Sequence, residues 1–158
     1  MEQRLNVLEH GQDALKAMMG LELYLAKSAI EQSLLHLIKF KVSQINGCAY
    51  CLDMHLKDLR AAGETEQRLY LLDAWRESPF YTDRERAALA WAEALTLVTN
   101  GHVSDEVYEE ARKEFNEQEL VDLTLAVTTI NCWNRISIAF RTTPGSYQPP
   151  SKTAHTTK

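Results

Sequence analysis

Apolar residues recur at intervals of three and four positions along most of this chain, which is the spacing of an amphipathic helix. No stretch sustains the strict alternation of apolar and polar residues that a half-buried strand requires. The pattern therefore predicts an all-α protein. The expected helices cover residues 12–28, 31–45, 48–63, 65–75, 82–98, 104–115 and 116–140.

Short local signals mark the boundaries of these helices. The Asn46–Gly47 pair is a turn signal between the second and third helices, and Gly63 is placed to end the third. Thr82 is followed three residues later by Glu85, which is a capping-box sequence. Ser104 is placed to cap the helix that follows. These signals predict helix ends independently of the apolar pattern.

The helical pattern fills residues 1–141, and we expect them to form a single helical domain. The remainder, residues 142–158, reads TTPGSYQPPSKTAHTTK and has almost nothing to bury. This polar, proline-bearing composition predicts a disordered tail.

Two segments of the domain resemble each other weakly. VSQIN at residues 42–46 and VTTIN at residues 127–131 both close apolar helices. Chance similarity between amphipathic helices would explain the echo equally well. If it is real, two related helical units pack together and one of them carries the cysteine pair.

The bulk composition excludes several classes of protein. A formal net charge of −5 without a basic cluster argues against nucleic-acid binding. No window approaches the roughly eighteen apolar residues of a membrane span, and the first residues lack a secretory pattern. We therefore expect a cytoplasmic protein. In that compartment a close cysteine pair indicates redox, catalytic or metal-binding chemistry more than a structural disulfide.

The candidate chemistry lies in NGCAYCLDMH, which contains Cys48, Cys51 and His55. On a helix, offsets of three and four residues put these side chains on one face. A thiol reacts as its thiolate, which a helix N-terminus and a nearby imidazole both favour. Two such thiols could reduce a peroxide, because one forms a sulfenic acid and the other condenses with it to a disulfide.

Two other interpretations of these residues remain open at this point. A zinc site normally needs four ligands, and only His36 offers itself as the fourth, since Cys132 is distant in sequence. The two cysteines could also be ordinary buried thiols, as free cysteine often is. The histidine and the turn favour the redox interpretation over both.

The segment from Leu34 to Leu69, which contains LLHLIKFKVSQINGCAYC, resembles the core of the AhpD-like alkylhydroperoxidases of the carboxymuconolactone decarboxylase superfamily. The similarity extends over residues 21–140. It implies an AhpD-like helical bundle with CxxC at the start of a central helix, a homo-oligomer (trimer or hexamer), and peroxide reduction without metal or haem. By resemblance, Cys51 attacks the peroxide, Cys48 is the resolving cysteine that forms the disulfide with it, and His55 relays the proton.

One position departs from the family motif, which places a glutamate twelve residues before the first cysteine. His36 occupies that position here. An imidazole can accept a proton near neutral pH, but it brings no negative charge. We expect one of three outcomes: His36 substitutes in the relay, another carboxylate such as Glu93 or Glu31 approaches, or activity is weak.

The sequence thus predicts a thiol-dependent peroxidase that reduces hydrogen peroxide or an alkyl hydroperoxide through Cys48 and Cys51. It would need an external thiol or dithiol reductant and no cofactor. Two alternatives stay open. One is a thiol redox sensor or assembly module without turnover. The other is an enzyme of the carboxymuconolactone decarboxylase type, although that chemistry does not require two thiols.

Overall fold

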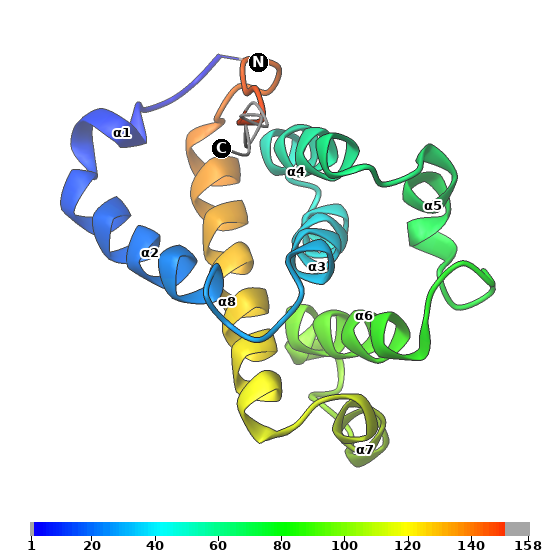
Figure 1. Ribbon diagram of the computed structural model, residues 1–158. Coiled ribbons are helices and arrows are strands. Elements are labelled where there is room, and N and C mark those ends of the chain that lie inside the picture. Colours follow the sequence, from blue (N-terminus) through cyan, green and yellow to red (C-terminus); the bar gives the residue numbers. More distant parts are fainter. Residues whose placement is uncertain (1, 151–158) are drawn as a thin grey trace, which may run out of the picture.

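The computed structural model describes residues 2–150, and this part of the chain is helical, with loops and no strand (Figure 1). The predicted all-α class is therefore confirmed. The α-helices are α1 (Val7–His10), α2 (Gln12–Leu25), α3 (Gln32–Asn46), α4 (Ala49–Ala62), α5 (Glu66–Leu71), α6 (Asp83–Thr96), α7 (Asp105–Glu114) and α8 (Glu117–Phe140). Two short 3₁₀ helices cover Leu72–Ala74 and Val98–Asn100.

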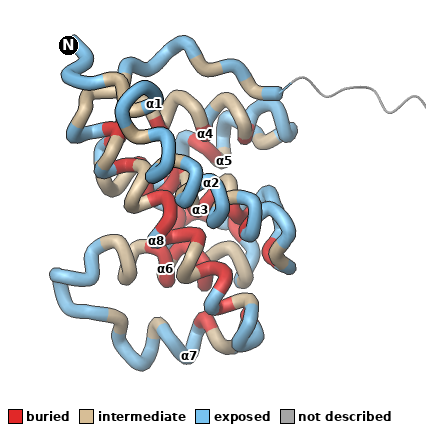
Figure 2. Tube along the Cα trace, turned by 90° about the vertical axis from the view of Figure 1, so that its left-hand side faces the viewer, coloured by how far each residue is buried: buried red, intermediate tan, exposed pale blue. Residues whose placement is uncertain are grey.

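Helix α3 lies at the centre of the fold and packs against α4, α6 and α8. Helix α8 runs the length of the molecule, with α2 on one side and α3, α4 and α6 on the other (Figure 1). Figure 2 shows the buried residues concentrated where α3, α6 and α8 meet, whereas α1 and α7 are largely exposed. None of the helices between residues 2 and 150 combines the length and the hydropathy that a membrane span requires.

The composition of α3 fits this central position. Its buried residues are distributed around the helix, as expected for a helix that is covered on several sides. They are Leu34, Leu35, Leu37, Ile38, Phe40, Lys41, Val42 and Ser43. The buried Lys41 ammonium lies 3.1 Å from an Asp73 carboxylate oxygen and 3.3 Å from one of Glu93, so its charge is paired.

The predicted helix ends agree with the structure to within a few residues. Gly63 ends α4 with φ of 101°, a left-handed conformation that glycine adopts without strain. Thr82 and Glu85 form the capping box that begins α6, and Ser104 caps α7. The short helix α1 was not predicted, because four residues are too few to display helical periodicity.

The two segments that echo each other in sequence also meet in space. Helices α3 and α8 pack together, and Nδ2 of Asn46 donates hydrogen bonds to Oδ1 of Asn131 at 2.9 Å and of Asn134 at 2.8 Å. Asn46 and Asn131 are the last residues of the echoed segments. A common origin of the two helices stays a prediction.

Helix α2 covers α8 but leaves much of its own apolar surface open. Leu25 is its one buried residue. Met19 and Leu23, four residues apart, have exposed fractions of 49% and 61%. Leu8 in α1 is 72% exposed. The N-terminal helices therefore carry large apolar side chains that the described chain does not cover.

Candidate functional site

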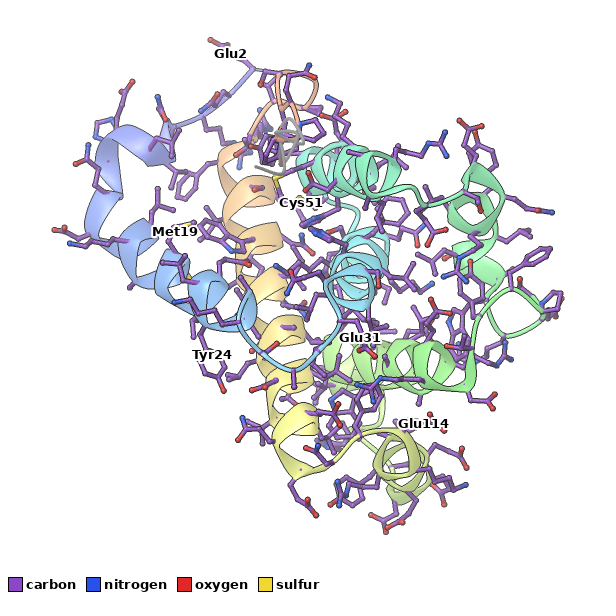
Figure 3. All side chains as sticks on the ribbon, in the orientation of Figure 1. Glu2, Met19, Tyr24, Glu31, Cys51 and Glu114 are labelled. Atoms are coloured by element: carbon purple, nitrogen blue, oxygen red, sulfur yellow. A yellow bond between two sulfur atoms is a disulfide. The ribbon has the colours of Figure 1, made fainter. Side chains whose placement is uncertain are left out.

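Cys48 and Cys51 form a disulfide at the start of α4 (Figure 3). Their Cα atoms are 5.4 Å apart, and each residue is only 1% exposed. Cys48 is the N-cap of α4, and its sulfur accepts a hydrogen bond of 3.4 Å from the backbone N–H of Cys51. The pair thus lies in the first turn, where backbone N–H groups favour a thiolate once the disulfide is reduced.

Gly47 positions this turn. It ends α3 with φ of 67°, and its N–H group bonds the carbonyls of Ser43 and Gln44. The N–H of Cys48 then donates to the Ser43 carbonyl at 3.0 Å. Because α4 begins directly after this cap, it folds back against α3. The left-handed conformation favours glycine, which explains the NG signal in physical terms.

His55 lies on the same face of α4 as Cys51 and is 4% exposed. Burial, reinforced by the positive charges of Lys39 and His36, lowers the pKa of His55 to about 3. The imidazole is therefore neutral at physiological pH. Among residues 2–150, neither ring nitrogen of His55 has a hydrogen-bond partner. In this disulfide state the Cys51 sulfur carries no proton, and no hydrogen bond joins it to His55.

His36 and Asp58 approach His55 from two helices. His36 is half-buried on α3, and Asp58 follows His55 by three residues on α4. One nitrogen of each histidine and one oxygen of Asp58 all lie within 4.8 Å of one another. Burial lowers the pKa of His36, and the charge of Lys39 acts in the same direction while Asp58 opposes it. The structure thus places His36, which occupies the motif position of the glutamate, beside His55 and Asp58.

The carboxylate at this site is neither of the two that sequence reasoning suggested. Glu93 accepts a hydrogen bond of 2.9 Å from the Trp75 indole, and Glu31 pairs with Arg84 at 3.0 Å. These contacts hold the two glutamates elsewhere, and the carboxylate that approaches the two histidines is that of Asp58. Asp58 was missed. The sequence feature that could have indicated Asp58 is its position three residues after His55, because this spacing places both side chains on one face of the helix.

The C-terminal segment also reaches α4. The Tyr147 hydroxyl donates a hydrogen bond of 2.7 Å to Oδ1 of Asp58. Lys57 donates to the carbonyls of Gly145 and Tyr147, and the Gly145 N–H donates to Asp53 at 2.9 Å. Burial, followed by the bond to Asp58 and the charge of that carboxylate, raises the pKa of Tyr147 to about 12. The phenol therefore remains a donor at neutral pH.

These contacts concern the segment for which the sequence predicts a disordered tail. Disorder was expected from residue 142 onward, but residues 145–147 follow α4 through polar contacts rather than apolar burial. Composition alone does not reveal such contacts, since each depends on a partner about ninety residues away. Residues 151–158, for which disorder was also predicted, lie outside the described residues.

A cavity of about 590 Å³ opens beside the disulfide. Residues 47–50 form one wall, and residues 137–138 and 141–144 from the end of α8 and the following segment form the other. Cys48 lines this cavity. A small molecule could therefore approach the disulfide between the start of α4 and the end of α8.

Several of these residues have metal-binding side chains. His36, His55 and Asp58 could hold an ion, whereas Cys48 and Cys51 are joined to each other. Cys132, on α8, is not disulfide-bonded and is half-buried, not fully buried as a small core residue would be. The alternative zinc set of two cysteines and two histidines is therefore not available in this disulfide state.

Related sequences share most of the chain. The chain is 48% identical to the uncharacterized protein YdfG of Bacillus subtilis over 139 residues, which cover 88% of this chain and 95% of YdfG. It is 30% identical to the uncharacterized protein YnjA of Escherichia coli over 114 residues, or 72% of this chain and 62% of YnjA.

Solved structures share the fold. A protein of unknown function from Agrobacterium tumefaciens, which carries the name of the antioxidant defence protein AhpD, matches with a TM-score of 0.88 and 42% identity. The match covers 92% of this chain and 100% of that one. The debrominase Bmp8 matches with a TM-score of 0.78 over 88% of this chain and 74% of its own, but at 21% identity this similarity concerns the fold alone.

The sequence also matches a protein-family model. The model of the carboxymuconolactone decarboxylase family matches residues 12–94, more than half of the chain, including both cysteines, His36, His55 and Asp58. The CxxC pair and the AhpD-like neighbour are compatible with a peroxidase-like redox role. The chain belongs to the carboxymuconolactone decarboxylase family, in its AhpD-like branch.

Proposed function

We propose that this protein is a thiol-dependent peroxidase that reduces hydrogen peroxide or an alkyl hydroperoxide through a Cys48–Cys51 dithiol–disulfide cycle. The observation that carries the proposal is the disulfide at the first turn of α4, on the helix that also presents the buried His55. A helix N-terminus and a neighbouring imidazole are the surroundings in which a thiol becomes reactive.

The cycle has three steps. The Cys51 thiolate attacks the terminal peroxide oxygen, the O–O bond breaks, and Cys51 becomes a sulfenic acid. The leaving group is an alkoxide from an alkyl hydroperoxide or a hydroxide from hydrogen peroxide, and it takes a proton to become an alcohol or water. The Cys48 thiol then attacks that sulfur, forming the disulfide and releasing water. An external dithiol finally donates two electrons and two protons and restores both thiols.

His55 is assigned as the group that moves the thiol proton. Its pKa of about 3 belongs to the disulfide form, in which the neighbouring sulfur carries no charge. A thiolate at Cys51, one helical turn away, would place a negative charge near the ring and favour its protonated form. Thiol and imidazole would then titrate as a coupled pair.

His36 and Asp58 are proposed to complete the relay in place of the family glutamate. His36 lies at the position of that glutamate, and Asp58 supplies the negative charge that an imidazole lacks. The Asp58 charge favours protonated His36, as the upward influence on the pKa of His36 indicates. A proton accepted by His55 could therefore pass toward His36 and Asp58.

The cavity beside Cys48 is the proposed entrance for peroxide and reductant. Both reactants must reach a sulfur, and Cys48 lines this cavity while the buried Cys51 is joined to it by the S–S bond. The physiological reductant would be a small-molecule or protein dithiol. A cytoplasmic location, which the sequence predicts, would supply such thiols.

We also propose that the protein functions as a homo-oligomer. Met19, Leu23 and Leu8 leave apolar surface exposed on α1 and α2. Exposed apolar surface of this kind often marks a subunit interface. The resemblance to AhpD-like proteins suggests a trimer or hexamer.

Peroxide consumption in the presence of a dithiol reductant tests the activity. The parent protein and Cys132→Ser should turn over, because Cys132 lies outside the disulfide. Cys51→Ser and Cys48→Ser should lose turnover, and His36→Glu should increase it by about tenfold or more, because it restores a carboxylate base.

Failure of the parent protein to consume any peroxide would overturn the proposal. If its disulfide nevertheless opened and closed reversibly, the thiol sensor would become the better interpretation. Full activity in both cysteine variants would exclude a Cys48–Cys51 cycle, both for the peroxidase and for the thiol sensor.

A further inference from the structure

We propose that His36, His55 and Asp58 form a binding site for a divalent transition-metal ion, with two imidazole nitrogens and one carboxylate oxygen as ligands. The three ligand atoms lie within 4.8 Å of one another. They come from two packed helices, α3 and α4, so that the backbone holds them together. The disulfide sulfurs take no part in this site.

The spacing suits a single ion after a small adjustment. Nitrogen and oxygen ligands bind transition metals at about 2.0–2.2 Å, which puts two ligands of one ion roughly 3–4 Å apart. Contraction from 4.8 Å therefore requires movements of about 1 Å. His36 is half-buried and can move by this amount, whereas the Tyr147 hydroxyl holds Asp58 and the packing of α4 holds the buried His55.

The site contains buried polar atoms that lack partners. Within the described chain, both ring nitrogens of His55 and Nδ1 of His36 have no hydrogen-bond partner. Buried polar groups are nearly always paired, and each exception calls for an explanation such as a bound ion or water. A metal ion would pair one nitrogen of each ring.

The surroundings of Asp58 are those of a metal ligand. The Tyr147 hydroxyl holds its Oδ1 at 2.7 Å, and metal-binding carboxylates are commonly oriented by such a second hydrogen bond. The nearby cation, Lys39, is paired with Glu22 at 2.5 Å. Because of this ion pair, the repulsion that a bound dication would meet is reduced.

The ligand set indicates which metals would bind. Two imidazoles and one carboxylate suit Zn²⁺, Co²⁺ and Fe²⁺, and are unsuited to Ca²⁺ and Mg²⁺, which prefer oxygen ligands throughout. Three protein ligands leave an open coordination position. His36 is central to this set, because the glutamate of the family motif would supply oxygen where this chain supplies nitrogen.

Binding would also have a functional consequence, which rests on the proposed peroxidase activity. A metal ion held by His36, His55 and Asp58 would occupy the groups through which the thiol proton of Cys51 is proposed to pass. We therefore expect Zn²⁺ to inhibit peroxide turnover. The binding itself does not depend on that activity and can be tested separately.

The test is a Co²⁺ titration of the tag-free, disulfide-bonded protein, followed by visible absorption and calorimetry. One ion per chain should bind. His36→Ala and Asp58→Asn should each weaken binding by at least tenfold, whereas His10→Ala, which changes an exposed histidine on α1, should bind like the parent. Circular dichroism identifies any variant that fails to fold, and His36→Gln then replaces His36→Ala.

Absence of stoichiometric binding would overturn the proposal, and so would parent-like affinity in folded His36 variants. Peroxide turnover of the metal-free protein, measured in parallel, reports on the proposed enzyme independently. An inactive protein that binds Co²⁺ would refute the peroxidase alone, and an active protein that binds none would refute the metal site alone.

Discussion

The Tyr147 hydroxyl donates a hydrogen bond of 2.7 Å to Oδ1 of Asp58, and thereby ties the C-terminal segment to the carboxylate beside His36 and His55. Residues separated by 89 positions are brought together by this bond. The segment that follows α8 is therefore part of the site's surroundings, and the orientation of Asp58 depends on it.

Tyr147→Phe tests this dependence. Removal of the hydroxyl should free Asp58 to rotate, and the loss of an orienting hydrogen bond typically weakens metal binding by about tenfold to a hundredfold. Co²⁺ affinity measured by calorimetry should fall accordingly. Tyr70→Phe is the matched control, because its exposed hydroxyl contacts Glu66 on α5, away from the site. Equal affinities in the two variants would refute the orienting role.

A second prediction concerns the buried amide that joins α3 to α8. Asn134 is fully buried, accepts from Asn46 at 2.8 Å and donates to the Ser43 hydroxyl at 3.1 Å. Asn134→Ala removes both of these hydrogen bonds, although Asn46 keeps Asn131 and Ser43 keeps the Lys39 carbonyl as partners. The loss of two buried hydrogen bonds should lower the free energy of unfolding by about 1–3 kcal/mol. Urea denaturation followed by circular dichroism measures the change.

The control for that substitution is Thr128→Ala, on the exposed side of α8. We expect its free energy of unfolding to stay within about 0.5 kcal/mol of the parent. Similar losses in both variants would mean that the buried amide network has no special role.

Acid stability should depend on Glu85. Burial raises the pKa of this carboxyl, but hydrogen bonds from Arg68 and from the Thr82 backbone outweigh burial and lower it below 4.5. When folding lowers the pKa of a carboxyl, that carboxyl stabilises the protein at any pH above its pKa in the unfolded chain. This contribution is lost as the pH falls through its pKa in the folded protein. The free energy of unfolding should therefore decline below about pH 4.5.

Glu85→Gln measures this contribution. It should reduce stability at pH 7 by about 1 kcal/mol, a value discounted for partial solvent exposure, and should flatten the acid decline. Glu109→Gln, an exposed change on α7, should alter neither. A Glu85→Gln variant with the parent's full acid dependence would contradict the assignment.

The helices themselves follow closely from local sequence. The Gly47 cap and the capping box at Thr82 each involve only a few neighbouring residues, and each occurs where its sequence signal predicts. Such features need no tertiary partner. That is why the boundaries of α3, α4, α6 and α8 were predictable to within a few residues.

The site was only partly predictable for the opposite reason. Cys48, Cys51 and His55 share one helix, so their proximity follows from helical geometry. The approach of His36 to Asp58 depends on how α3 packs against α4, and the approach of Tyr147 depends on the path of the chain after α8. The geometry of a single helix carries no information about contacts between helices or with the chain after α8.

The exposed apolar residues of α1 and α2 predict association. Light scattering coupled to size-exclusion chromatography should give the mass of a trimer or hexamer. Leu23→Glu, which places a charge on a residue that is 61% exposed, should shift the protein toward smaller species while preserving its helical circular dichroism. A parent protein that is monomeric at micromolar concentration would contradict the oligomer proposal.

The central claim is that Cys51 reacts with peroxide and Cys48 resolves the product. Its most direct test is Cys48→Ser, reduced, exposed to one equivalent of peroxide with dimedone present, and mapped by mass spectrometry. The account predicts a dimedone adduct on Cys51, and a Cys48–Cys51 disulfide in the parent treated alike. An unmodified Cys51 in the variant, with an adduct on Cys48 in Cys51→Ser, would contradict it.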